Sequence, residues 1–490
     1  MAKTRAAKST DPDRLPAGKL LAWAGAGMSA AANFIVLGYL SIYATDTLGI
    51  SAAMVGVMIL VGSIASVVGG LVASWIVDRS PETKWGKARP YEFAVIGVWL
   101  ATWMLFSTPA GLGDVGRVVW VFAMFLAINV LFDPLLRSND TLYMARAFRN
   151  RRVYAKVYTR AGIFTTIMGI IMTVGLPVAI SWAGKDPGQW SIVMGAVSIP
   201  LAILGMTRFL FVKEEFQTAD TGAPPVKVRD LFATLAAGKW IWLIAGLFFL
   251  NSAINGANMI SYYFRYVVGD LALQGVVAGA GVLILPLILF FPKLMKRFGI
   301  SQIIIVGCSL GLVGTGFYYF ANGSIPLLMV GGILGGLASL PLSYLGGVMI
   351  LDVCAFNEWK GKRRLESTMG AVTGVIGRIG IGVAGLVVGL ILTASGYDGT
   401  VDVQTDTANS AIVGLFAGVP AFVFLGIIIL MFFYLHFDLK ILPQVNADLD
   451  ARRAQADADA LTREEEDASV PLTATAAIPG EQASPPHDIS

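Results

Sequence analysis

The chain has 490 residues, of which 56% are hydrophobic and only 14% are charged, and its mean hydropathy is +0.70. A soluble domain carries about 25% charged residues because its surface must face water, so this composition excludes an ordinary soluble protein and predicts one embedded in a lipid bilayer. The net charge of +4 is small and predicts no nucleic-acid partner. Cys308 and Cys354 lack a metal-type spacing, and no metal site is predicted.

Apolar runs of about 20 residues, the length that crosses a bilayer, follow one another along most of the chain. The first six predicted spans are 19–43, 51–77, 91–110, 118–145, 155–182 and 189–212. After a short N-terminal segment, 1–18, they form a half at 19–212, and a polar middle loop, 213–238, follows. The second half, 239–438, contains spans at 239–266, 271–293, 301–321, 325–351, 367–396 and 410–438. The tail 439–490 is expected to hold a short polar helix and otherwise to be largely disordered.

The predicted fold class is therefore an all-α membrane protein with about twelve transmembrane helices in two six-helix halves. Lysine and arginine gather in every second loop, and the opposite loops are short and poor in them. The basic clusters include Arg79, Lys84, Lys87, Arg89, Arg146, Arg151, Lys156, Lys293, Arg297, Lys360, Lys362, Arg363 and Arg364. The positive-inside rule then predicts that both termini are cytoplasmic and that the protein is a multi-pass protein of a bacterial cytoplasmic membrane. We expect a monomer.

Motifs typical of enzymes are missing from the sequence. It contains no HExxH, no P-loop, and no GxGxxG between a strand and a helix. The chain is therefore predicted not to be an enzyme, to need no cofactor, and not to be a self-contained ATP-driven pump.

Ionisable residues inside the fourth predicted span form a stripe on one helical face. Asn129, Asp133, Arg137 and Asp140 are spaced by four, four and three residues. Since a charge at the bilayer centre is costly, such residues normally face a cavity and have a partner. One interpretation is a stripe that touches the solute or a coupling ion. The other is a self-neutralising stripe that only fixes helix packing.

The eleventh predicted span carries Arg378 about eleven residues from its start, too deep to reach water easily. We expect it to pair with Asp133 or Asp140 across the two halves. This pair is either a static lock between helices or a group that binds solute and moves.

Further candidates for solute binding lie on the seventh span, where asparagines share a face. They are Asn251, Asn255 and Asn258, followed by Tyr262. Amides and aromatic rings suit sugar hydroxyls and ring faces, although amides also join helices by hydrogen bonds. Arg160, near the start of the fifth span, is either a cavity residue or one that reaches to the interface.

Four segments resemble one family of transporters. They are YATDTLGIS (43–51), SWIVDRSPETKWGKARPY (74–91), FFPKLMKRFG (290–299) and DVCAFNEWKGKRRLES (352–367). In these segments the chain is similar to the glycoside–pentoside–hexuronide cation symporters of the major facilitator superfamily. The cytoplasmic gate or loop ion pairs expected here involve Asp78, Arg79, Lys87, Arg89, Asp352, Glu358, Arg364 and Glu366.

The resemblance also implies where the family's functional side chains fall. The two carboxylates that hold the coupling cation in the sugar symporters fall on Ser66 and Gly70, with a neighbouring amide position at Gly69. A sugar-binding aspartate of the first helix falls on Ala30. The family's cation site is therefore absent. In contrast, the positions of its helix-11 lysine and helix-5 arginine fall on Arg378 and near Arg160, and its helix-4 aspartate falls on Asp133 or Asp140.

The predicted function is secondary transport of a small polar solute, a sugar, glycoside or sugar acid, by alternating access. Transport is expected to be coupled to protons or uncoupled. Two alternatives remain at this point: a transporter of lipids or amphiphiles with the same fold, and a non-transporting membrane sensor or assembly protein.

Overall fold

A computed structural model describes residues 16–148, 151–215, 238–295, 297–361 and 366–469. In this part of the chain the structure is helical apart from one isolated bridge between Thr83 and Gly86. Ten of the described helices are long and apolar enough to cross a membrane. In hydrocarbon every backbone polar group must be satisfied within its own segment, which an apolar helix achieves. The predicted all-α class is confirmed.

The first group of helices runs from the N-terminus to Phe211. Its elements are α1 (Ala17–Leu37), α2 (Leu40–Ile42), η1 (Tyr43–Thr47), α3 (Ala52–Arg79), η2 (Arg89–Phe93), α4 (Ala94–Leu105), α5 (Asp114–Leu126), η3 (Ala127–Phe132), α6 (Asp133–Ala147), α7 (Arg151–Ala183) and α8 (Pro187–Phe211). We call this group the first half.

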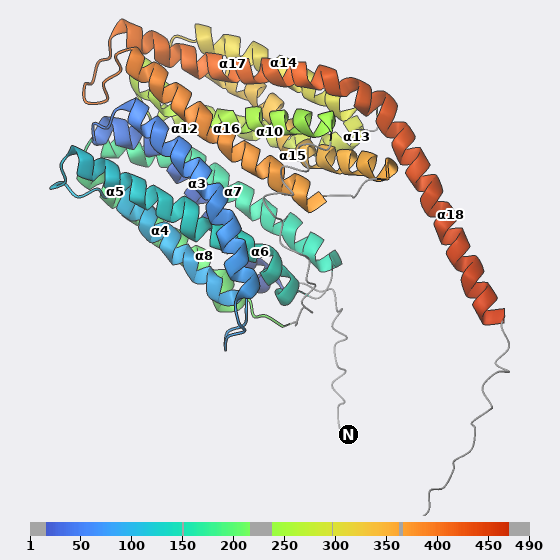
Figure 1. The fold of residues 1–490 in the computed structure, drawn as a ribbon. Helices are drawn as coiled ribbons and strands as arrows, with labels where there is room; N and C mark the ends of the chain where they lie inside the picture. The colour runs from blue at the N-terminus through green and yellow to red at the C-terminus, as the bar shows by residue number, and fades with distance from the viewer. Residues whose placement is uncertain (1–15, 149–150, 216–237, 296, 362–365, 470–490) are drawn as a thin grey trace, which may run out of the picture.

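The second half begins at Lys239. Its elements are α10 (Lys239–Ala257), α11 (Ile260–Tyr263), η4 (Phe264–Val268), α12 (Leu273–Ala280), η5 (Gly281–Phe290), α13 (Phe291–Met295), α14 (Ile300–Phe320), α15 (Ile325–Trp359), α16 (Glu366–Ala394), α17 (Asp406–His436), η6 (Phe437–Ile441) and α18 (Leu442–Ser469). Figure 1 shows α18 extending away from the bundle as a continuation of α17. The short polar helix expected in the tail is this α18, and it is longer than predicted.

Two predicted spans differ from continuous membrane-length helices. The third consists of the short 3-10 helix η2 and the twelve-residue α4. The eighth is divided into α12, η5 and α13, with Pro286 inside its 3-10 segment. Proline removes one backbone donor and disfavours a regular α-helix, which accounts for a break that a hydropathy count does not reveal. Most of the predicted middle loop, at 216–237, lies outside the described residues, as does the tail from 470 onward.

Several helices begin at side chains that cap them. Ser51 accepts a hydrogen bond from the Met54 amide at the start of α3, and Asp186 accepts from the Gly188 amide before α8. Thr405 does the same for α17 through the Ala408 amide. Such caps satisfy amide groups that have no partner within the helix. They fix where each loop ends and each of these spans begins.

The two halves meet along a seam between α3 and α16. A Cβ atom on Gly56 would lie 2.8 Å from the Gly385 carbonyl oxygen, and one on Gly389 would lie 2.3 Å from the Ala52 carbonyl oxygen. These glycines allow two backbones from different halves to approach closely, as small residues do in membrane helix pairs. The seam involves the first part of α3 and the last part of α16.

We call the end of the bundle with loops 48–51, 184–186, 269–272 and 395–405 the closed end, and the end with loops 80–88, 297–299 and 360–361 the open end. The two halves lie together at the closed end and diverge toward the open end (Figure 1). Hydrogen bonds and ion pairs that join the halves within the described residues lie between the middle of the bundle and the closed end. The structure is therefore open on one side only.

The positive-inside rule places the open end in the cytoplasm, and cysteine labelling tests this orientation. Thr400 lies at the closed end and Lys84 at the open end, and both side chains are exposed. In whole cells, a Thr400→Cys variant should react with a membrane-impermeant maleimide, and a Lys84→Cys variant should react only after the membrane is permeabilised. Cys308 and Cys354 are buried and should give little background. The reverse labelling pattern would contradict the predicted topology.

Candidate solute site

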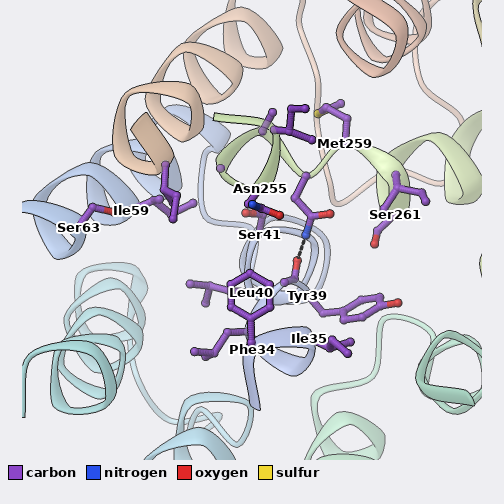
Figure 2. Close-up of a pocket in the computed structure, with 18 of the residues that line it drawn as sticks. Phe34, Ile35, Tyr39, Leu40, Ser41, Ile59, Ser63, Asn255, Met259 and Ser261 are labelled. Carbon is purple, nitrogen blue, oxygen red and sulfur yellow. Dashed lines mark hydrogen bonds between the residues drawn. The ribbon is translucent and has the colours of Figure 1, made fainter. Parts of the chain in front are cut away.

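A cavity of about 680 Å³ lies between the two halves near the middle of the bundle. Cavities of roughly 300–1,000 Å³ are typical of small-molecule sites. Figure 2 shows that side chains from both halves surround it, among them Phe34, Ser41 and Ser63 from the first half and Asn255 from the second. Its position at the interface between halves is the place where transporters built from paired halves bind solute.

Charged residues of the predicted stripe line one wall of this cavity. Asp133 and Arg137 form an ion pair along α6, with 2.6 Å between the Asp133 Oδ2 and Arg137 Nε atoms, and Asn129 lies one turn earlier. Arg378 lines the cavity from α16 and makes no hydrogen bond or ion pair with the described residues. A guanidinium aimed at a cavity without a partner is suited to bind a ligand oxygen.

The predicted pairing of Arg378 with Asp133 or Asp140 is not made in this conformation. Asp133 is occupied by Arg137, one turn along the same helix. Asp140 is paired with Arg208 of α8. Both carboxylates therefore have cations closer than Arg378, although Asp133 still attracts Arg378 electrostatically.

The asparagines of the seventh span divide between the cavity and the helix packing. Asn255 and Asn258 line the cavity, and Asn258 sits where α10 stops. Its backbone has a φ of 26°, in the left-handed region that asparagine tolerates better than most residues. Its amide donates to the Gly38 carbonyl oxygen of the first half. Discontinuous helices of this kind often border solute sites in transporters.

Three predicted solute ligands do not line this cavity. Asn251 lies on α10, half-buried, and Arg160 is exposed on α7. Tyr262 is almost fully buried at the closed end, where its hydroxyl is 3.1 Å from Thr45 Oγ1. In this conformation Tyr262 therefore holds the halves together and does not face the solute space.

A second cavity of about 380 Å³ lies inside the first half and shares Asp133 and Arg137 with the central cavity. Asp140 and Arg208 also line it. Arg208 pairs with Glu92 as well as with Asp140, so one guanidinium contacts two carboxylates.

A cluster around Asp46 closes the opposite end. The Asp46 carboxylate is fully buried and lies 3.2 Å from Arg265 Nε of the other half. The Tyr266 hydroxyl donates to it at 2.8 Å, and the Tyr397 hydroxyl donates to its other oxygen. Thr45 donates to the same carboxylate at 2.8 Å. One carboxylate of the first half is therefore bound by three side chains of the second.

A second contact reinforces this closure. Lys185 of the first half forms an ion pair with Asp402 at 2.9 Å and donates to the Val401 carbonyl oxygen at 2.7 Å. Because Asp402 is exposed, this pair is screened by water and is worth less than the buried cluster.

The predicted gate residues of the first half contact their own half. The Lys87 ammonium donates to the Asp78 carbonyl oxygen at 2.9 Å, and the Arg79 guanidinium lies 4.6 Å from the Trp75 ring centre. Arg89 donates to the Phe209 carbonyl oxygen at 2.7 Å. These contacts leave the halves free to separate at the open end.

The predicted gate residues of the second half behave in the same way where they are described. Glu358 lies 3.6 Å from Arg453 of α18. Asp352 has a buried carboxylate oxygen without a hydrogen-bond donor among the described residues. Arg364 lies outside the described residues, and of Glu366 only the backbone is described, as the first residue of α16.

Sequence reasoning missed the groups that make the strongest charge contacts. Glu92, Arg208 and Arg265 lie near the ends of their predicted spans. A charged side chain there can reach the membrane–water interface, so its presence does not by itself indicate a buried site. Asp46 lies in the segment YATDTLGIS (43–51), which was used only for the family resemblance. A further example is Glu214, whose carboxylate accepts hydrogen bonds from three consecutive amides, those of residues 87–89, and pairs with Arg146. Glu92, Arg208 and Arg265 could have been identified as candidates by considering every ionisable residue within an apolar run, including those near its ends.

Two helical halves around a central cavity, closed at one end only, are typical of a membrane transporter. Residues 23–435 match the MFS/sugar transport protein family, which covers most of the chain, and the protein belongs to that family. It is therefore a multi-pass membrane transporter and not an enzyme, and the resemblance noted in the sequence is confirmed.

The relatives support the same assignment. The chain is 28% identical to the isoprimeverose transporter of Lactiplantibacillus pentosus over 444 residues, covering 86% of this chain and 89% of that protein. It is 22% identical to the glucuronide carrier protein homolog of Escherichia coli, covering 85% and 91%. Among solved structures, a bacterial homolog of the lysosomal transporter Spinster, inward-facing and unoccupied, superposes with a TM-score of 0.65 at 12% identity over 86% of this chain and 97% of the other. That likeness shows the major facilitator fold.

The closed-end cluster predicts how an Asp46→Ala variant changes the conformational balance. Removing one member of a buried ion pair leaves the other charge unpaired, at a cost of about 3–5 kcal/mol, and only the closed conformation suffers this cost. We expect spin labels at Val115 and Val403, exposed residues of opposite halves at the closed end, to move apart in the variant. Pulsed electron paramagnetic resonance on purified protein measures the distance between the two labels.

An Asp270→Ala variant is the matched control, because Asp270 lies at the same end, is exposed, and accepts a hydrogen bond only within its own half. Its distance distribution should equal that of the unsubstituted protein. An unchanged distribution in Asp46→Ala would show that the cluster does not hold the end closed.

Proposed function

We propose that this protein carries a sugar, glycoside or sugar acid across a bacterial cytoplasmic membrane by alternating access. The observation that carries the proposal is the cavity between the halves, whose walls carry the amides of Asn129, Asn255 and Asn258 and an arginine, Arg378, that has no partner among the described residues. With the predicted orientation, the conformation described here opens that cavity to the cytoplasm.

The choice of a sugar-type solute rests on the lining and on the relatives. Amides and hydroxyls pair with sugar hydroxyls, and the cavity walls supply both, with Ser41 and Ser63 beside Asn255. Two relatives are named for sugars of different charge. Isoprimeverose, in the name of the first, is neutral, and a glucuronide, in the name of the second, is an anion. The free guanidinium of Arg378 favours the anionic member of that range, because charge-assisted hydrogen bonds to a carboxylate are the stronger ones.

The helix packing around Gly69 supports transport without sodium. A Cβ atom on Gly69 would lie 2.3 Å from the Val130 carbonyl oxygen of η3, so the backbone of the fourth span fills the space of a side chain there. Ser66 is buried and donates its hydroxyl hydrogen to Ser63 of its own helix. A hard cation needs several oxygen ligands, and these positions offer few.

Uptake by vesicles that contain the purified protein tests the proposed function. Labelled isoprimeverose, methyl glucoside and methyl glucuronide are suitable probes, each measured with and without an opposing solute inside. At least one of them should exchange across the membrane faster than in empty vesicles. Adding sodium or lithium at fixed membrane potential should leave the rate unchanged. If none of the sugars exchanges, the proposed function is wrong, and stimulation by sodium would reveal another cation site.

Substituting Arg378 tests its assignment as the group that selects an anionic sugar. A hydrogen bond to a charged group is worth about 1.5–3 kcal/mol, so Arg378→Gln should weaken binding of methyl glucuronide by roughly 10- to 100-fold. Binding of methyl glucoside, which has a hydroxymethyl group in place of the carboxylate, should change little. Isothermal titration measures both. Arg79→Gln, at an exposed arginine that stacks on Trp75, is the control. Equal losses for the two sugars would contradict the assignment.

A further inference from the structure

A second group of buried charges lies beside the solute cavity, inside the first half. Glu92 of η2 is fully buried and Arg208 of α8 is 4% exposed. Arg208 binds Glu92 with two nitrogens, at 2.7 Å from Nε to Oε2 and 2.6 Å from Nη2 to Oε1. Its third nitrogen donates to Asp140 of α6. The guanidinium also lies over the Trp23 ring, 4.7 Å from its centre.

This cluster carries more negative than positive charge. Two carboxylates face one guanidinium, so the positive charge that balances the second carboxylate must come from outside the cluster. When two carboxylates share a site, one of them binds a proton more readily than an isolated carboxylate does. Asn139, fully buried, donates to Glu92 at 3.2 Å, and its own oxygen has no donor among the described residues.

The geometry identifies Asp140 as the carboxylate that gains the proton. Glu92 is bound twice by Arg208 and has no contact with water. Asp140 is bound once, its side chain is 37% exposed, and it lines the second cavity. Protonation of Asp140 would leave the Glu92–Arg208 pair intact as a neutral, doubly bonded unit. Protonation of Glu92 would break the better pair.

Charged and titratable groups face Asp140 from several elements. They are Arg208 on α8, Glu92 on η2, Tyr158 on α7 with its hydroxyl 3.4 Å from Asp140 Oδ2, and Asp133, Arg137 and Tyr143 on α6. From α3, which also packs on α6, the nearby contact is the uncharged pair of Ser74 with Ser138.

The proton site and the solute cavity are connected through Arg137. It lies one turn before Asp140 and one turn after Asp133, and both carboxylates attract it. It lines both cavities. A proton on Asp140 removes one of the two negative charges acting on Arg137, so more of its positive charge is available to a solute.

We propose that Asp140 binds the coupling proton of this transporter and that its protonation favours an anionic sugar at Arg137 and Arg378. The proton comes from water in the second cavity and forms an O–H bond on the Asp140 carboxylate, and no other bond changes. The six charges around the two cavities balance before binding, with Glu92, Asp133 and Asp140 against the three arginines. An anionic sugar adds one negative charge, and one proton restores neutrality.

This inference rests on the proposed sugar transport, and methyl glucuronide with its neutral counterpart methyl glucoside serves as the probe pair. Purified protein in weakly buffered detergent should take up protons when methyl glucuronide is added and not when methyl glucoside is added. Affinity for the glucuronide should weaken as pH rises, by at most about tenfold per pH unit for a single proton. The affinity falls as pH rises because only the protein with a protonated Asp140 binds the glucuronide, and a single proton limits the change to about tenfold per pH unit.

An Asp140→Asn variant imitates the protonated group and should separate coupling from binding. It should bind methyl glucuronide with an affinity that does not vary with pH. In vesicles it should exchange the glucuronide across the membrane but fail to concentrate it under an imposed proton gradient. Asp114→Asn, at a fully exposed aspartate on α5, is the matched control and should behave as the unsubstituted protein. Asp140→Glu, which keeps a carboxylate, should retain proton-driven accumulation and shows whether a defect comes from misfolding.

Accumulation of glucuronide by Asp140→Asn under a proton gradient would overturn the inference, and so would the absence of proton uptake by the unsubstituted protein on binding glucuronide. If neither sugar is bound at all, the proposed function fails separately. The proton site is then still tested by infrared difference spectra between low and high pH, in which the carboxyl band of the unsubstituted protein should be reduced in Asp140→Asn. An identical band in both proteins would overturn the assignment of the site.

Discussion

Asp46 is fully buried between the two halves, and its charge is compensated by Arg265 and by hydroxyl groups from Tyr266 and Tyr397. A carboxylate in hydrocarbon cannot draw on water, so these three partners must all be present when it is buried. They come from one half and the carboxylate from the other. The stability of the closed end is therefore tied to a contact that exists only when the halves meet.

At the open end, the charged side chains also need partners, but they find them within their own half. Glu214 and Arg146 pair within the first half, and Glu358 and Arg453 pair within the second. Both of these pairs lie within a single half, so separation of the halves breaks neither of them. The molecule can open on this side at little electrostatic cost. Whether charge pairs lie within a half or between halves thus determines which end opens in this conformation.

The sequence was sufficient for the membrane class, the succession of spans and the polar stripe on α6, because these depend on hydropathy and on helical periodicity. It was not sufficient for partner choice. Asp133 or Asp140 was expected to meet Arg378 from the second half, and each of them instead pairs with an arginine of its own half. Periodicity places a residue on a face of its helix, but the neighbouring helix depends on how the bundle packs, which no local pattern encodes. The break in the seventh span at Asn258 was not predicted for a related reason, since no proline marks the place where the helix is interrupted.

Association between the halves depends on polar contacts to an unusual degree because the surrounding lipid is itself apolar. Burying leucine against leucine gains little when both already contact hydrocarbon, so packing of small residues and specific polar contacts must hold the halves together. The seam at Gly56 and Gly389 supplies close packing between backbones, and packing of this kind weakens quickly when two helices separate. The buried carboxylate cluster adds polar contacts between the halves at the closed end. Under the proposed function, a solute that engages Arg378 of the second half and Arg137 of the first compensates part of the cost of opening the Asp46 cluster, and its binding energy thereby contributes to moving the halves.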